Sequence, residues 1–164
     1  MSCANLEKGK LHPILKINCK SKGDLHRLPI KLKLLTGAYI LQSNRIKMYK
    51  NELNALCLLC EKDGETIEHF ILDCEQLKEV REPIIQDIDR VLNWRKLSEN
   101  VQLQLLLDIT ASTRNLKLDP ASVANIEYCA RRLTSQLHIL HYRKIMDRQG
   151  TNKHIGITGT VQKM

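Results

Sequence analysis

Three cysteines and a histidine near the middle of the chain have the spacing of a metal site. Two residues separate Cys57 from Cys60, eight more precede His69, and another four precede Cys74. Structural zinc is held by four thiolate and imidazole ligands in a tetrahedron, and a Cys-x2-Cys pair supplies two of them from one turn. The spacing therefore predicts a CCHC zinc knuckle that binds one structural Zn2+. Four protein ligands leave no open position for a catalytic water.

The segment between the two halves of this motif has the composition of a turn followed by a short helix. Asp63 and Gly64 favour a chain reversal, and a helix over residues 65–72 would present His69 from one face. A different interpretation is that the cysteines are buried apolar residues and that the histidine belongs to the core. That interpretation explains four correctly spaced ligands poorly. We expect zinc to contribute to folding, so that its loss loosens the helices that the site joins.

Length and composition indicate one folded domain. A chain of 164 residues buries one ordinary core, and 43% hydrophobic against 27% charged residues is typical of globular chains. We expect a mainly α fold, a small helical domain held together by the zinc site, with flexible termini. The predicted boundaries are a basic flexible lead-in at 1–27, the helical zinc-binding domain at 28–147 with the knuckle at 57–74, and a disordered tail at 148–164.

Helical periodicity flanks the knuckle on both sides. Before it, apolar spacing predicts a helix over residues 29–48, in which Gly37 either allows another backbone to approach or breaks the helix in two. After it, an apolar stripe spans residues 75–93, and we expect Pro83 to kink that helix or to start a second one. Ser98 has the character of an N-cap for the helix that follows.

The longest predicted helix covers residues 120–147. Asp119 followed by Pro120 is its start signal. Its apolar stripe is close to a heptad repeat and consists of Val123, Ile126, Ala130, Leu133, Leu137 and Leu140. A coiled-coil dimer or another protein partner on this stripe is one interpretation, and packing against its own domain is the one that we favour.

Charge is unevenly distributed along the chain. Lys and Arg outnumber Asp and Glu by 11 to 2 in residues 1–50 and by 7 to 1 in residues 129–164, whereas acidic residues lead by 15 to 8 between them. Basic ends attract polyanions through counterion release, which favours non-specific nucleic-acid binding. For any single residue, an ordinary solvated helix face is the alternative. The candidate phosphate contacts are Lys31, Lys33, Arg45, Lys47, Lys50, Arg131 and Arg132.

Other sequence signals set the cellular context. The chain has neither a secretory signal nor a run of about 18 apolar residues, which predicts an intracellular protein, nuclear or cytoplasmic, that is not secreted and has no membrane partner. In a reducing compartment its six cysteines are expected to be thiols or metal ligands. His138 and His141 lie three apart on the long helix, and we interpret them as ordinary helix residues rather than as a second metal site.

Three stretches of the sequence resemble the C-terminal zinc-binding segment of LINE-type (non-LTR) retrotransposon reverse transcriptases. They are LLTGAYILQSNR at 34–45, CLLCEKDGETIEHFILDC at 57–74 and LKEVREPI at 77–84, with a looser similarity at 128–144. The family's four ligands fall on Cys57, Cys60, His69 and Cys74. The resemblance implies a zinc-binding tail that lies beyond the polymerase and helps to hold RNA template or target DNA.

The same resemblance implies no catalysis by this segment alone. The sequence contains no Tyr-x-Asp-Asp motif and has no room for a polymerase palm. We therefore expect a non-enzymatic domain that binds nucleic acid, either RNA or DNA, and that derives from the tail of a reverse transcriptase. The alternatives are a zinc-stabilised protein-interaction module and an inert remnant of the element.

Overall fold

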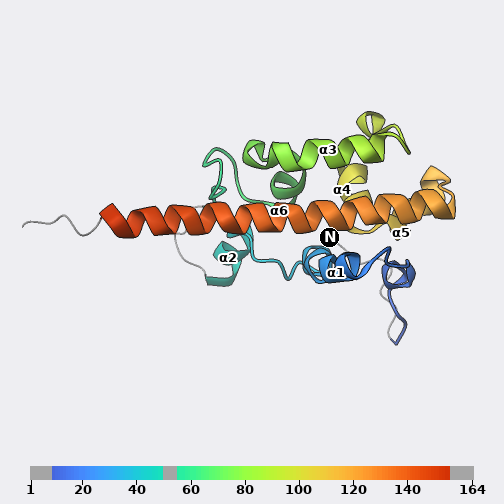
Figure 1. Cartoon of the computed structure of the whole chain (residues 1–164), viewed down its shortest axis with the longest axis horizontal. Helices are drawn as coiled ribbons and strands as arrows, with labels where there is room; N and C mark the ends of the chain where they lie inside the picture. Colours follow the sequence, from blue (N-terminus) through green and yellow to red (C-terminus); the bar gives the residue numbers. More distant parts are fainter. Residues whose placement is uncertain (1–8, 50–54, 156–164) are drawn as a thin grey trace, which may run out of the picture.

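Helix α6, Pro120–Ile155, is the central element of the fold, and α1, α3, α4 and α5 all pack against it. The computed structural model describes residues 9–49 and 55–155. In Figure 1, α1 and α3 lie on opposite sides of α6, and α4 and α5 pack along its N-terminal half. Within the described residues all regular elements are helical, apart from one isolated antiparallel bridge between Leu56 and Gly64. The prediction of a mainly α fold is confirmed.

Helix α6 begins where the sequence predicts. The Oδ1 atom of Asp119 accepts hydrogen bonds from the backbone amides of Ala121 and Ser122, at 2.9 and 3.0 Å. The Ser122 hydroxyl and these amides lower the pKa of Asp119, because they stabilise its charged form. The helix continues to Ile155, beyond the predicted end at residue 147. Residues 156–164 of the predicted disordered tail lie outside the described residues.

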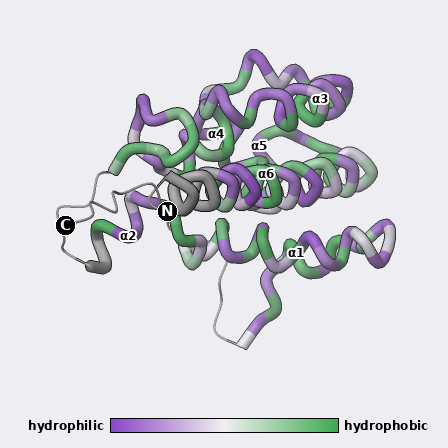
Figure 2. The backbone as a smooth tube through the Cα atoms, turned by 60° about the vertical axis from the view of Figure 1, so that its left-hand side comes forward, coloured by the Kyte–Doolittle hydropathy of each residue, from purple (hydrophilic) through white to green (hydrophobic). Residues whose placement is uncertain are grey.

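The apolar stripe of α6 is covered by its own domain. Ile126, Ala130, Leu133 and Leu137 are completely buried. Hydrophobic and hydrophilic residues alternate in short runs along this helix (Figure 2), as expected for an element with neighbours on several sides. The stripe therefore forms the centre of one core, and its heptad-like spacing is used for packing within the chain.

The region predicted as one helix over 29–48 contains two. Helix α1, Lys22–Leu35, starts earlier than expected because the Ser21 hydroxyl accepts a hydrogen bond from the Asp24 amide. Pro29 lies inside α1. Because proline has no backbone N–H, it cannot donate to the carbonyl of Leu25, four residues earlier, and Leu25 is an exposed residue. Gly37 has a φ angle of 73°, in the left-handed region, and separates α1 from α2, Gln42–Tyr49.

Part of the predicted flexible lead-in is packed against the domain. A 3-10 turn at Pro13–Lys16 buries Ile14 completely, and the guanidinium of Arg131 on α6 donates to the carbonyls of Ile14 and Ile17. The packed helical region therefore extends before residue 28. The rest of the lead-in, residues 1–8, lies outside the described residues.

The helices after the knuckle form the other side of the core. They are α3, Lys78–Asp89, α4, Glu99–Leu107, and α5, Ile109–Leu116. Helix α3 continues through Pro83, so no second helix starts there. Ser98 is the N-cap residue of α4, as predicted, and Asp108 caps α5 by accepting from the Thr110 amide. No helix in the described part of the chain combines the length and the apolar character that crossing a membrane requires.

Candidate metal centre

The structure brings the four predicted ligands together. The ligand atoms of Cys57, Cys60, His69 and Cys74 all lie within 4.8 Å of one another. The sulfurs of Cys57 and Cys74 are 3.8 Å apart, and the sulfur of Cys60 lies 3.3 Å from Nε2 of His69. This arrangement can hold one metal ion, and the convergence predicted from the spacing is confirmed.

A short hairpin positions the Cys-x2-Cys pair. The amide of Cys57 donates to the Asp63 carbonyl at 2.7 Å, and the amide of Glu65 donates to the Ala55 carbonyl at 2.8 Å. At the turn, the Glu61 amide closes back on the Cys57 carbonyl, and Glu61 adopts a left-handed φ of 58°. The chain therefore reverses over residues 57–61, earlier than the predicted turn at Asp63 and Gly64, and these two residues lie on the returning arm, where Gly64 bridges to Leu56.

The second ligand pair comes from a π turn at His69–Asp73. The Cys74 amide donates to the His69 carbonyl at 2.7 Å, an i to i+5 bond that brings residues five apart onto the same side of the turn. The Thr66 hydroxyl accepts from the His69 amide and starts the turn. The sequence predicted a helix over 65–72. The π geometry replaces it because the ligand spacing of five residues matches a π turn.

Backbone amides surround the three sulfurs. Those of Leu59 and Cys60 point at Cys57, those of Lys62 and Asp63 at Cys60, and that of Gln76 at Cys74. Such amides stabilise thiolate charge.

Burial acts against that charge at two of the sulfurs. Burial raises the pKa of Cys57 to about 12 and also raises that of Cys74. At Cys60 burial also acts to raise the pKa, but the amides prevail and lower it. A bound cation would supply the compensating charge that two buried thiols need in order to ionise.

Arg81 on α3 holds the backbone beside the metal ligand Cys74. Its side chain is 7% exposed and donates to the Cys74 carbonyl at 2.5 Å and to the Ile71 carbonyl at 3.4 Å. Burial lowers the pKa of Arg81, while the nearby thiol of Cys74 acts to raise it. The guanidinium therefore fixes the end of the π turn and places a positive charge beside a ligand set that carries net negative charge when it binds a divalent ion.

The centre is open to solvent on one side. Cys57 and Cys74 are 2% and 0% exposed, whereas Cys60 is half-buried. Cys60 and His69 line a surface cavity of about 420 Å3. A metal ion could enter by this route.

Two of the predicted phosphate contacts are buried instead. Lys31 is 0% exposed and forms an ion pair with Glu127, and Arg131 is 1% exposed. Arg131 also pairs with Glu127, at 2.8 Å, and with Asp24, at 3.1 Å. Since neither cation reaches the surface, the assignment of Lys31 and Arg131 to nucleic-acid contact is wrong. A charge in the interior requires such partners.

The remaining candidates are not gathered into one surface. Lys33 and Arg45 are exposed on α1 and α2. Arg132 is half-buried and pairs with Asp87 of α3 at 3.4 Å. Lys50 and the side chain of Lys47 lie outside the described residues.

His138 and His141 on α6 have protein partners, as expected for the ordinary helix residues that the sequence interpretation favoured. His138 lies with Nδ1 2.8 Å from the Tyr39 hydroxyl, and His141 lies with Nε2 2.8 Å from Oε1 of Glu65. Glu65 is 1% exposed, and its other oxygen accepts from the Gln42 amide. Glu65 could not be predicted as a partner from the sequence, because its contacts come from α2 and α6, far away in the chain.

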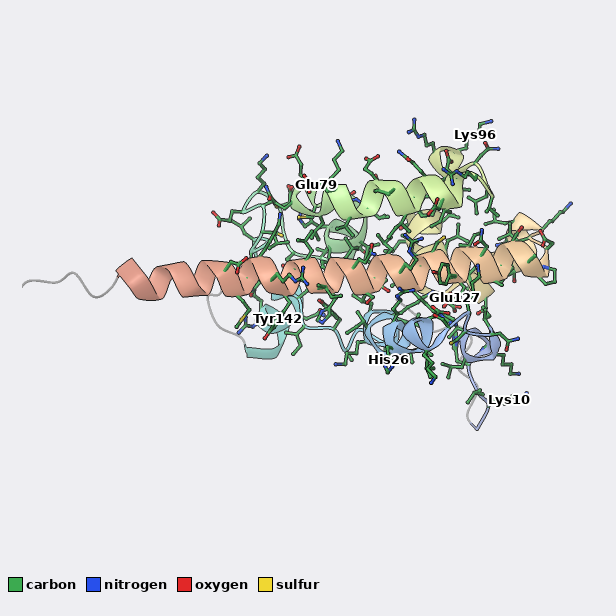
Figure 3. The ribbon with its side chains drawn as sticks, in the orientation of Figure 1. Lys10, His26, Glu79, Lys96, Glu127 and Tyr142 are labelled. Carbon is green, nitrogen blue, oxygen red and sulfur yellow. The ribbon has the colours of Figure 1, made fainter. Side chains whose placement is uncertain are left out.

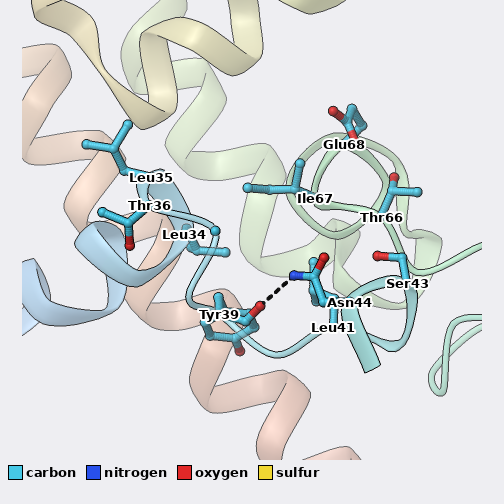
Figure 4. Close-up of a pocket in the computed structure, with 11 residues that line it drawn as sticks. Leu34, Leu35, Thr36, Tyr39, Leu41, Ser43, Asn44, Thr66, Ile67 and Glu68 are labelled. Atoms are coloured by element: carbon cyan, nitrogen blue, oxygen red, sulfur yellow. Dashed lines mark hydrogen bonds between the residues drawn. The ribbon is translucent and has the colours of Figure 1, made fainter. Parts of the chain in front are cut away.

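A second cavity, of about 330 Å3, lies between the end of α1, the start of α2 and the residues before the π turn (Figure 4). The Asn44 side chain donates to the Tyr39 carbonyl at its edge. Among the described residues that line it, Glu68 is the one with a charged side chain. The described part of the lining therefore offers no basic group to a phosphate.

Comparison with known proteins adds no relative. Protein-family models, curated proteins and solved structures each give no match to this chain. The similarity to the zinc-binding tail of LINE-type reverse transcriptases therefore stays a prediction from the motifs.

Proposed function

We propose that Cys57, Cys60, His69 and Cys74 bind one structural Zn2+. The observation that carries this proposal is the sulfur–sulfur distance of 3.8 Å between Cys57 and Cys74. Zinc–sulfur bonds of about 2.3 Å at tetrahedral angles separate two sulfurs by roughly 3.8 Å. Three thiolates and one imidazole form a ligand set that binds zinc in preference to harder ions.

Metal content measured by native mass spectrometry tests the zinc site. Wild type is expected to carry one zinc per chain, and Cys57→Ser and His69→Ala are expected to lose it together with helicity. Cys19→Ser is the control, since Cys19 is exposed and outside the cluster. Well-folded wild type without zinc would contradict the proposal and leave the cysteines as buried thiols.

We further propose that the protein is a non-catalytic module that binds RNA or DNA without sequence preference, of the kind found at the end of retrotransposon reverse transcriptases. Support comes from the basic terminal segments and from Lys33, Arg45 and Arg132, which remain accessible. Contacts of this kind neutralise backbone phosphates and release counterions.

Fluorescence anisotropy with labelled single-stranded RNA and duplex DNA tests nucleic-acid binding. Affinity is expected to fall steeply between 50 and 200 mM salt, about tenfold or more if several phosphates are contacted. Two unrelated sequences should bind alike. Absence of binding at 50 mM salt to either polymer would contradict this function.

The protein-interaction alternative rests on one exposed apolar face near the end of α6. Ile139, Tyr142 and Met146 are 45%, 57% and 47% exposed, at spacings that place them on one side of the helix. A protein that docked there would bind with little salt dependence. Replacing all three with serine should abolish such binding and leave nucleic-acid affinity unchanged.

A further inference from the structure

Three positive side chains surround the ring of Tyr128. The Nζ atom of Lys20 lies 4.5 Å from the ring centroid, and the Cζ atoms of Arg27 and Arg132 lie 5.8 and 5.9 Å from it. These contacts are in the range of cation–π interactions. Because all three surround one ring, their mutual separations are comparable to the screening length of about 10 Å at 0.1 M salt. Their repulsion is therefore not screened away.

The three cations come from different parts of the chain. Lys20 precedes α1, Arg27 lies on α1, and Arg132 lies one turn after Tyr128 on α6. Figure 1 shows α1 and α3 on opposite sides of α6, and Arg132 reaches α3 through Asp87. The cluster therefore spans the face of α6 between its two flanking helices. Lys20 is exposed, and the other three side chains are half-buried, so the cluster is accessible from solvent.

The nearby carboxylates do not neutralise all three cations, so the cluster keeps an excess of positive charge. Within residues 9–49 and 55–155, Asp87 is the one carboxylate paired with any of the three cations, and it also pairs with Arg90 at 3.1 Å. Lys20 donates instead to the neutral amide of Asn125. The nearby buried carboxylates of Asp24 and Glu127 are paired with Arg131 and Lys31.

We propose that Lys20, Arg27 and Arg132, gathered around Tyr128, form the site that contacts the backbone phosphates of a bound polynucleotide. This site rests on the nucleic-acid function proposed above and supplies its contact residues, of which Lys20 and Arg27 were not predicted from the sequence. Guanidinium and ammonium donors match the several acceptor oxygens of a phosphate. Since cations occupy the surroundings of the ring, Tyr128 organises the donors rather than stacking on a base. Binding should therefore be insensitive to base sequence.

A charge-matched pair of double variants tests this site. Lys20→Gln with Arg27→Gln removes two positive charges from the cluster. Arg95→Gln with Lys96→Gln removes one exposed Arg and one exposed Lys from the 3-10 turn Trp94–Lys96. Figure 3 shows Lys96 on the opposite side of α6 from His26, which neighbours Arg27 on α1. Thermal unfolding of both variants establishes that they fold. Affinity for a labelled single-stranded RNA is then measured by anisotropy at several salt concentrations.

The cluster variant is expected to bind at least tenfold more weakly. The slope of log affinity against log salt should also become shallower, by about 0.7 for each phosphate that the variant no longer neutralises. The control should bind less than threefold more weakly than wild type. A charge-retaining variant, Lys20→Arg with Arg27→Lys, should stay within about threefold of wild type and excludes a general structural effect.

Two outcomes would overturn the site and are distinguishable. Equal losses of affinity in the cluster and control variants, with wild type binding RNA, would reject this site and leave the proposed function in place. Wild type that binds no polynucleotide, and captures an acidic protein or nothing, would reject both the function and the site that rests on it.

Discussion

Nε2 of His141 on α6 lies 2.8 Å from Oε1 of Glu65, which belongs to the hairpin that carries the first two metal ligands. The other carboxylate oxygen of Glu65 holds the Gln42 amide at the start of α2. One buried side chain therefore joins the metal hairpin to two helices. Ordering of the hairpin and ordering of these helices are consequently coupled.

Replacing Glu65 with alanine is expected to destabilise the protein by about 3 kcal/mol, because the buried imidazole of His141 and the amide of Gln42 both lose their partner. Urea unfolding at pH 7 measures the change. Glu68→Ala is the control, since Glu68 is exposed and three residues away, and it should change the free energy of unfolding by at most about 0.5 kcal/mol. Equal effects of the two substitutions would contradict the role given to Glu65.

Glu127 neutralises two buried cations, Lys31 and Arg131. Glu127→Gln is expected to cost about 3–5 kcal/mol, since it leaves Lys31 buried without a counterion. Adding Lys31→Met should recover a large part of that loss, because no buried ammonium then remains. Denaturant unfolding of the single and double variants checks both statements. A double variant no more stable than Glu127→Gln alone would count against charge imbalance as the cause.

Arg81 is expected to influence metal affinity without being a ligand. Arg81→Met removes the donors to the carbonyls of Cys74 and Ile71, so the π turn loses its support. Supporting contacts of this kind change affinity by about 10- to 100-fold. Competition with a chromogenic chelator measures zinc affinity, and Lys78→Gln, an exposed position one turn earlier on α3, is the control. Unchanged affinity in Arg81→Met would show that the turn holds its shape without the guanidinium.

The stability of the fold should decrease as pH falls below neutrality, in part through His138. Burial, with the nearby charges of His141 and Lys33, lowers the pKa of His138 from its ordinary value of 6.5. As the pH falls, His138 is therefore protonated in the unfolded chain before it is protonated in the folded protein. Its contribution to stability is present above pH 6.5 and is lost as the pH falls through the lower, folded-state pKa.

Unfolding free energies between pH 7.5 and 5 for wild type and His138→Gln test this dependence. The variant should lose less stability over this range than wild type. Acid release of metal affects both proteins, so the difference between the two profiles isolates His138. His26→Gln, at an exposed position of α1, should parallel wild type. If His138→Gln also parallels wild type, the titration of His138 does not contribute.

Structural features that depend on a few neighbouring residues could be predicted from the sequence. The ligand set follows from its spacing, and the start of α6 follows from Asp119 and Pro120, whose capping chemistry is local. The break at Gly37 was one of two alternatives, and the left-handed φ decides it. The π turn was not predicted, because periodicity does not distinguish it from a short α-helix.

The burial of Lys31 and Arg131 could not be read from composition. A lysine or arginine is normally a surface residue, and the partners that allow burial lie 96 residues from Lys31 and 107 residues from Arg131. The i to i+4 spacing of Glu127 and Arg131 was the one local signal, and on an exposed helix it would indicate only a weak surface pair.

The central position of α6 determines when the chain can become stable during its synthesis. The N-terminal elements reach α6 through partners that are 96, 99 and 117 residues apart in sequence, and the metal hairpin reaches it across 76 residues. Contacts of such long range form only after the chain between them has closed. Before α6 has been synthesised, the nascent chain therefore exposes the apolar faces that α1, α3, α4 and α5 bury against it, and residues 120–155 complete the core.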